Sequence, residues 1–290
     1  MSRVAGAVLV VHRLEFPLPV SYLCYAVWGA CLARGDIGIF TEPLVYVTLL
    51  VNLLLMVGGL ALNVAVDLET DRRQPGKDYL AGATLRLGRT RVLQFSIAET
   101  TVALVLAGLV AVWTNHWPVV VFAGTTALLH QLYNIDPFRL KRKVAGPFVF
   151  GASMVPLPCL LAYSAFRVDF EPALWPFLLG VCSLSVGRTI WWSVPDHAVD
   201  TATGFTTPAV RFGSAGALRM ASLSVLVGTA LLGWSLWWFY GPAWAAIGMA
   251  AHVIFLLRMT SSIYPRHMLK HTMPIVMLGD VALVVIPLIA

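Results

Sequence analysis

Residues 44–71 read LVYVTLLVNLLLMVGGLALNVAVDLETD and decide how this chain folds. Residues 44–66 are almost entirely apolar, and about 20 such residues are enough for a helix to cross a bilayer. Asn63, Asp67 and Asp71 stand at the end of this run with a spacing of four residues. This spacing keeps side chains on one face of a helix. The stretch therefore predicts a membrane-spanning helix with a polar stripe where it reaches water.

The composition of the whole chain agrees with a membrane protein. Of its 290 residues 59% are apolar and 12% are charged, and the mean hydropathy is +0.80. An average soluble domain has roughly 45–50% apolar and about 25% charged residues. These values exclude a disordered chain and an ordinary cytosolic enzyme. The net charge of +6 is typical of basic loops beside a membrane, so we expect no nucleic-acid partner.

The fold class predicted from the apolar runs is an all-α integral membrane protein, a bundle of nine transmembrane helices with two long cytoplasmic loops capping the site. We expect one domain over residues 1–290, with a short lead-in before the first span. A four-helix unit over residues 16–134 could be repeated over 145–260, with the ninth helix added. The predicted spans are 16–34, 44–66, 93–113, 117–134, 145–165, 172–195, 217–238, 242–260 and 273–290.

The basic residues predict the orientation. With nine spans, 18 of the 20 Lys and Arg residues fall on one side, and only Arg34 and Arg167 fall on the other. Cytoplasmic loops are enriched in Lys and Arg. The N-terminus is therefore predicted in the cytoplasm and the C-terminus on the opposite side. Arg266 and Lys270, in the last loop, belong to the cytoplasmic group.

A second acidic motif follows the predicted sixth span. Asp196 and Asp200 repeat the four-residue spacing of the first motif and lie on the same predicted side. Carboxylates gathered at a membrane surface repel one another unless a cation joins them. Mg²⁺ prefers oxygen ligands and binds through a few carboxylates together with substrate phosphates. We therefore predict that the two motifs hold Mg²⁺ and, through it, a diphosphate.

Cationic and aromatic residues near these motifs complete the predicted site. Lys77 follows the first motif, and Arg139 and Lys141 lie in the next cytoplasmic loop. These cations could donate to phosphate oxygens and stabilise a leaving group. Tyr133 precedes that loop and could stabilise a developing cation by cation–π contact.

These residues together resemble the UbiA superfamily of intramembrane prenyltransferases. Asn63, Asp67 and Asp71 are similar to its first motif, NDxxDxxxD, with Val64 where that motif has its second residue. Asp196 and Asp200 are similar to its second motif. Lys77 begins a segment similar to Arg-Pro-Leu-x-x-Gly, and residues 133–141 are similar to the family's segment between helices four and five.

The resemblance implies Mg²⁺-dependent transfer of a prenyl group from a prenyl diphosphate to an aromatic or quinone-precursor acceptor through an allylic carbocation. The catalytic residues that it implies are the four carboxylates of Asp67, Asp71, Asp196 and Asp200. The metal ligands would be Asn63, Asp67, Asp71, Asp196 and Asp200, and the substrate would contact Asn63, Lys77, Tyr133, Arg139 and Lys141. A terpene cyclase of the same superfamily, which needs no acceptor, stays open. A transporter or a membrane scaffold is the alternative from another class. The predicted partners are thus a prenyl diphosphate, a small hydrophobic acceptor and the lipid bilayer.

Overall fold

The computed structural model describes residues 3–74, 76–261 and 272–290, without the side chains of residues 260–261. Arg266 and Lys270 lie outside the described residues. Within the described parts the chain is built of helices, and the one backbone bridge pairs Lys143 with Thr206.

Long and short helices are interspersed along the chain. The first half of the chain contains α1 (Arg3–Val11), α2 (Leu18–Arg34), η1 (Ile37–Thr41), α3 (Pro43–Val66), α4 (Leu68–Asp71), α5 (Asp78–Leu87), α6 (Arg89–Thr114) and α7 (Pro118–Asn134). The second half contains η2 (Leu140–Arg142), α8 (Gly146–Met154), α9 (Pro156–Phe166), α10 (Leu174–Ser193), η3 (Val194–Asp196), α11 (His197–Ala202), α12 (Pro208–Tyr240), α13 (Pro242–Ser261) and α14 (Met273–Ile289).

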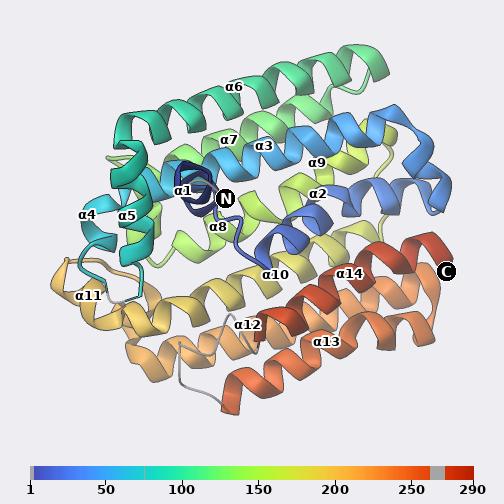
Figure 1. Ribbon diagram of the computed structural model, residues 1–290. Coiled ribbons are helices and arrows are strands. Elements are labelled where there is room, and N and C mark those ends of the chain that lie inside the picture. The colour runs from blue at the N-terminus through green and yellow to red at the C-terminus, as the bar shows by residue number, and fades with distance from the viewer. Residues whose placement is uncertain (1–2, 75, 262–271) are drawn as a thin grey trace.

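The long helices lie side by side, and the short helices α4, α5 and α11 gather at one end of the bundle (Figure 1). The C-terminus lies at the opposite end. We refer to the end with α4, α5 and α11 as the capped end. Six stretches of the described residues are long and apolar enough to cross a membrane, namely α3, α6, α8 with α9, α10 with its continuation to Ala202, α12 and α13. The chain is therefore an integral membrane protein.

Every predicted span is helical in the structure, but two of them differ from a single straight helix. The fifth, 145–165, is divided into α8 and α9 at Val155, because Pro156 lacks an N–H and disfavours helical geometry in the residue before it. The seventh was predicted from residue 217, whereas α12 begins at Pro208 and is kinked at Gly213, whose φ is 71°. The helices α2, α7 and α14 each have 17 residues, which is short for a span.

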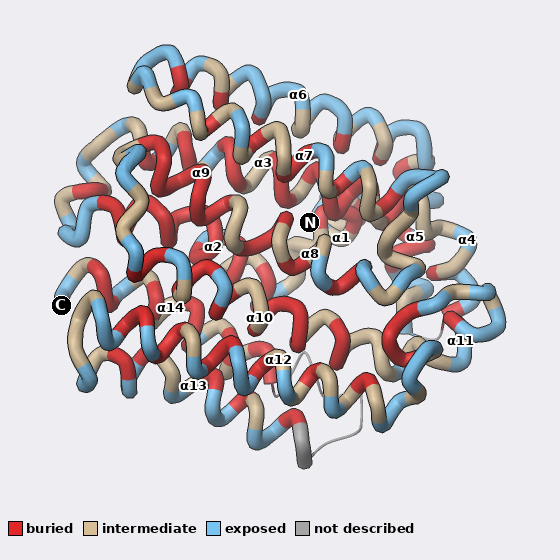
Figure 2. The backbone as a smooth tube through the Cα atoms, turned by 180° about the vertical axis from the view of Figure 1, so that it is seen from behind, coloured by how far each residue is buried: buried red, intermediate tan, exposed pale blue. Residues whose placement is uncertain are grey.

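The helices differ in how much of their surface is covered by protein. In its most apolar window α3 is 61% buried, whereas α6 and α13 are each 28% buried. Figure 2 shows buried residues along the inner helices and mostly exposed residues along α6. Apolar side chains at the periphery, such as Leu109 and Trp237, are exposed. Such an outer surface suits hydrocarbon, so α3 is central and α6 and α13 are peripheral.

Glycines allow the central helices to approach closely. A Cβ at Gly29 of α2 would collide with the backbone of α9 at Cys159. Gly180 of α10 and Gly228 of α12 face each other, and a Cβ on Gly228 would lie 2.8 Å from the Gly180 carbonyl oxygen. Helices in a bilayer associate through this kind of close packing, since lipid provides little hydrophobic driving force between them.

Polar contacts inside the bundle connect helices that are distant in sequence. Asn52 of α3 donates to the carbonyl oxygens of Ala26 and Pro158, each at 3.0 Å, and so ties α3 to α2 and α9. Arg188 of α10 forms an ion pair with Asp280 of α14, with 3.7 Å between Nη1 and Oδ1. The side chain of Asp280 is fully buried. An isolated charge at this depth is costly, so each residue depends on the other.

The predicted lead-in is a short helix, α1, which packs mainly against α5. His12 follows α1 and contacts Glu99 of α6, with 2.8 Å between Nε2 and Oε1. The two long loops predicted after the second and sixth spans are themselves partly helical, since they contain α4 and α5, and η3 and α11. The capped end is therefore an ordered layer over the ends of the long helices.

Candidate functional site

The first acidic motif straddles the end of α3. Asp67 has non-helical dihedral angles (φ −93°, ψ 3°) and ends α3, and α4 starts at Leu68 and ends at Asp71. The predicted uninterrupted helical stripe is thus broken at Asp67. Asp71 is buried, and Asn63 and Asp67 are half-buried. Val64 is buried in an apolar cluster with Leu80 of α5, so its side chain contributes to the packing of α3 against α5.

Asp67 is held by the loop that follows α7. Lys141 Nζ lies 2.7 Å from one carboxylate oxygen of Asp67, and Arg139 Nη2 lies 3.5 Å from the other. Lys141 also donates to the side-chain oxygen of Asn134, at 3.2 Å, and Asn63 donates to the same oxygen at 2.9 Å. Arg139 adds a hydrogen bond to the Val66 carbonyl oxygen. The structure therefore brings both predicted phosphate-binding cations of this loop to the first motif.

The second motif lies at the end of α10, where η3 and α11 continue the chain. Asp196 accepts a hydrogen bond from Lys77 Nζ, at 2.9 Å, and another from the side chain of Gln74. Asp200 accepts a hydrogen bond from the Thr207 hydroxyl at 2.9 Å. Lys77 was expected beside the first motif, but its ion pair is with the second. Lys77 and Gln74 thereby join the two motifs across more than 100 residues of sequence.

Two carboxyl groups of the site have unusually high pKa values. Burial, together with the nearby Asp67, raises the pKa of Asp71 to about 6. Burial raises the pKa of Asp200 to about 6 as well, and Asp196 adds to the rise while Thr207 opposes it. A carboxyl group with a raised pKa gains more than usual from a nearby cation, because the cation stabilises its charged form.

Burial also disfavours the charged form of Lys141, which for a lysine means a lower pKa. Burial lowers its pKa to about 8, although Asp67 favours the charged form. Its side chain is 7% exposed. A charged group that is desolvated to this extent is available to a further anion, which would stabilise the ammonium.

Tyr133 lies at the end of α7, within the electrostatic range of both Asp67 and Asp200. Its ring packs against Phe150 with 5.5 Å between ring centroids. Of the predicted residues, Tyr133 is therefore the aromatic group that lies near carboxyl groups of both motifs.

The donor set has the chemistry of a magnesium site, but the structure does not assemble it into a closed cluster. Within residues 3–74, 76–261 and 272–290, no three His, Cys, Asp or Glu side chains lie close enough together to hold a metal ion. Asp67 and Asp196 are instead engaged by lysines, and Asp71 and Asp200 are buried carboxyl groups that a divalent cation would stabilise. The donors thus fit Mg²⁺ by type and by their common location, and the five-residue ligand set stays a prediction.

Four residues of the site were not predicted from the sequence. Gln74 and Thr207 hold the second motif, and Asn134 links Asn63 to Lys141. Arg13, which has a positive φ of 54°, lies in the electrostatic range of Asp71 and pairs with Glu15 at 3.6 Å. Single polar residues in long loops give no periodic signal, so only the spatial arrangement reveals them.

The bundle and the paired acidic motifs at its capped end define a class of polytopic membrane protein with buried carboxyl groups and basic side chains gathered at one end. The sequence profile described as the UbiA prenyltransferase family matches residues 22–273. The chain therefore belongs to the UbiA prenyltransferase family. Comparison with curated proteins gives no match.

Solved structures share the fold at low sequence identity. A UbiA homologue from Archaeoglobus fulgidus bound to GPP and Mg²⁺ is 17% identical, with a TM-score of 0.74, and the similarity covers 97% of this chain and 99% of that one. The apo structure of a UbiA homologue from Aeropyrum pernix K1 is 15% identical, with a TM-score of 0.73 and coverage of 93% and 96%. A digeranylgeranylglyceryl phosphate synthase is 17% identical, with a TM-score of 0.66 and coverage of 99% of both chains. These neighbours confirm the predicted all-helical fold of the UbiA type, whereas the count of nine transmembrane helices stays a prediction.

Proposed function

We propose that this protein transfers a prenyl group from a prenyl diphosphate to a small hydrophobic, aromatic acceptor in a Mg²⁺-dependent reaction. The observation that carries this proposal is the joining of the two acidic motifs by Lys77 and Gln74 at the capped end. Membership in the UbiA prenyltransferase family supports the reaction type. A fold neighbour bound to GPP and Mg²⁺ supports the donor class and the metal.

Each side chain has a role that follows from its position. Mg²⁺, when bound, would neutralise the diphosphate as a Lewis acid and orient it. The donors that would hold it are Asn63, Asp67, Asp71, Asp196 and Asp200. Lys77, Arg139 and Lys141 would exchange their carboxylate partners for phosphate oxygens and stabilise the leaving group.

The bond chemistry requires little more from the protein. The allylic C–O bond breaks, its electron pair leaves with the diphosphate, and the acceptor attacks the resulting carbocation and then loses a proton. Tyr133 is positioned to stabilise the cation with its ring. The surrounding apolar helices exclude water, which would otherwise capture the cation.

We also propose that the capped end faces the cytoplasm and that the C-terminus lies on the opposite side. The basic residues that lie away from the capped end support this orientation. Arg34 pairs with Glu42, and Arg167 pairs with Asp169 and Glu171, so these two arginines are neutralised locally. This orientation requires an odd number of membrane crossings, and nine is the number proposed. The duplicated four-helix unit is proposed as well, since α3 packs along α6 and α10 packs along α12 in corresponding positions.

Purified protein with a panel of prenyl diphosphates, with and without phenolic acceptors, tests the proposed function. We expect acceptor-dependent turnover that requires Mg²⁺ and is abolished by both Asp67→Ala and Asp196→Ala. The control is Asp78→Asn, because Asp78 is an exposed acid at the same end of the bundle. Full activity in both alanine variants would sink the proposal, and a cyclic hydrocarbon formed from donor alone would assign a terpene cyclase instead.

A further inference from the structure

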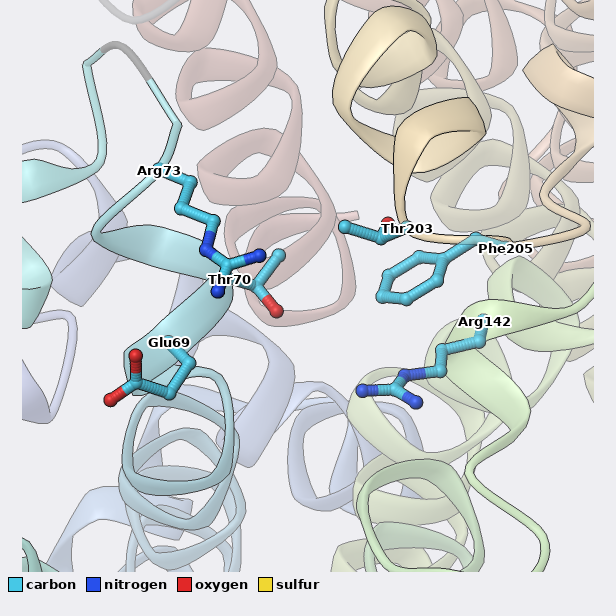
Figure 3. Close-up of a pocket in the computed structure, with 6 residues that line it drawn as sticks. All are labelled: Glu69, Thr70, Arg73, Arg142, Thr203 and Phe205. Carbon is cyan, nitrogen blue, oxygen red and sulfur yellow. The ribbon is translucent and has the colours of Figure 1, made fainter.

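A pocket of about 190 Å³ opens at the capped end, outside the carboxylate site (Figure 3). It is lined by Glu69, Thr70, Arg73, Arg142, Thr203 and Phe205. Three segments form its walls: α4 with the residues after it, η2, and the turn after α11. One water needs only about 10–15 Å³, so the pocket has room for a polyatomic ligand.

The pocket has an excess of positive charge. Arg73 and Arg142 extend into it from different walls (Figure 3), and its one acidic side chain, Glu69, lies 3.7 Å from Arg72. The Arg142 guanidinium stacks on Phe205, 4.6 Å from the ring centroid, and its Nε is buried without a hydrogen-bond partner. Burial and the nearby Arg139 also lower the pKa of Arg142. An anion in the pocket would remove both the unsatisfied donor and the repulsion.

The pocket and the carboxylate site are built on the same three segments. Lys141 turns inward to Asp67, whereas Arg142 beside it lines the pocket. Thr203 lines the pocket, and its hydroxyl lies within hydrogen-bond distance of two backbone oxygens of α11, that of Val199 at 2.9 Å and that of Asp200 at 3.2 Å. The backbone N–H of Thr206 donates to the Arg142 carbonyl oxygen at 2.7 Å and so joins two of the walls. The pocket and the carboxylate site are thus neighbours at the capped end.

We propose that the Arg73–Arg142 pocket binds a phosphate-class anion, and that its occupant is the inorganic pyrophosphate released by the reaction. The inference rests on the proposed function, because that function produces a lipid-soluble product and a highly charged one that must separate. The prenylated product stays in the bilayer, whereas pyrophosphate has to leave through the capped end. Guanidinium groups bind phosphate oxygens in two-pronged geometry, and the Thr70 hydroxyl adds a donor on the same wall as Arg73 (Figure 3).

The test is calorimetric titration of inorganic pyrophosphate into the full chain in phosphatidylcholine nanodiscs containing EDTA. Chelation of divalent metal separates this pocket from the Mg²⁺-dependent carboxylate site. We expect saturable binding by the unmodified protein. Each guanidinium contributes charged hydrogen bonds, so Arg73→Gln and Arg142→Gln should each weaken binding about tenfold, and the double variant more than either.

The matched control is the double variant Arg86→Gln/Arg91→Gln. It removes the same charge from exposed residues that do not line the pocket. It should bind pyrophosphate within about twofold of the unmodified protein, because distant exposed charges are screened by salt. An equal loss in this control would overturn the proposal, since the affinity would then reflect overall charge.

Two further outcomes separate the alternatives. A protein that turns over a prenyl diphosphate with Mg²⁺ but binds no pyrophosphate in EDTA overturns the pocket assignment and leaves the proposed function standing. Nanodiscs containing phosphatidylglycerol distinguish the product from a lipid headgroup. Unchanged pyrophosphate binding there supports the product, whereas competitive loss that depends on Arg142 assigns the pocket to the lipid phosphate and overturns the product assignment.

Discussion

Replacing Lys141 by methionine is expected to stabilise the folded protein while removing its activity. The ammonium of Lys141 is desolvated in the site, and its pKa falls from 10.5 to about 8 even though Asp67 lies 2.7 Å away. One pKa unit corresponds to about 1.36 kcal/mol, so the charge costs the folded state about 3 kcal/mol relative to the unfolded chain. Methionine keeps most of the side chain's length and apolar contact without that charge.

The pH dependence gives this prediction a second readout. Because the folded-state pKa is depressed, the unfolded chain holds the proton between about pH 8 and pH 10.5 while the folded chain has lost it. Stability of the unmodified protein therefore rises with pH through this window. The Lys141→Met variant should lack this rise. Both proteins should differ most below pH 8, where the lysine is charged in either state.

Thermal unfolding followed by tryptophan fluorescence measures the effect. A gain of about 3 kcal/mol corresponds to roughly 6–12 °C in Tm for a chain of this size, at about 2–4 °C per kcal/mol. Lys143→Met is the matched control, because Lys143 is exposed two residues further along and should leave Tm nearly unchanged. A lower Tm for Lys141→Met at pH 7, with no rise between pH 8 and pH 10 in the unmodified protein, would refute the reasoning. Turnover by Lys141→Met should fall at least about a hundredfold if this cation contacts phosphate.

Three further predictions concern the scaffold. Burial opposes the charge of His12, but hydrogen bonds with Glu99 and the Val8 carbonyl oxygen outweigh burial and raise the pKa of His12. The packing of α1 against the bundle should therefore be tightest below pH 6.5 and loosen as the pH rises through the raised pKa. Hydrogen exchange in α1 should show this pH dependence, and His12→Gln should abolish it. Asp280→Leu should destabilise the protein by about 3–5 kcal/mol because it leaves the charge of Arg188 buried without a counterion. The double variant Arg188→Leu/Asp280→Leu should regain much of the lost free energy of unfolding, because it removes both charges. Gly29→Ala should lower Tm because its Cβ would collide with α9, whereas Gly108→Ala, with nothing within 4 Å of the new Cβ, should not.

Much of the helical framework could be predicted from hydropathy. Each predicted span is helical, although the fifth is divided into two helices, because a run of about 20 apolar residues has few stable alternatives in a bilayer. Pro156 is a local signal for the helix break at Val155, but hydropathy alone does not detect it, because the apolar run continues through this point. The start of α12 at Pro208 was missed because its first turns include exposed polar residues such as Arg211.

Less of the site could be predicted. Spacing and the predicted side of the membrane were enough to select the candidate ligands Asn63, Asp67, Asp71, Asp196 and Asp200. Their partners were not, because hydrogen bonds from Gln74, Asn134 and Thr207 depend on how loops fold over the helix ends. The pocket between Arg73 and Arg142 has no counterpart in the sequence pattern either, since its walls come from three separate segments.

Sequence alone was enough to predict that this chain enters the membrane, roughly where its apolar helices lie, and that two acidic motifs stand at corresponding helix ends, because length, hydropathy and residue spacing are local properties. Tertiary structure alone decided the pairing of charges. Lys77 follows the first motif in sequence yet binds Asp196 of the second, and Arg188 meets Asp280 from the last helix. Such pairs join residues that are distant in sequence, so their partners depend on how the whole bundle packs; charges attract more strongly where the surroundings have a low dielectric constant, as for the buried Arg188–Asp280 pair.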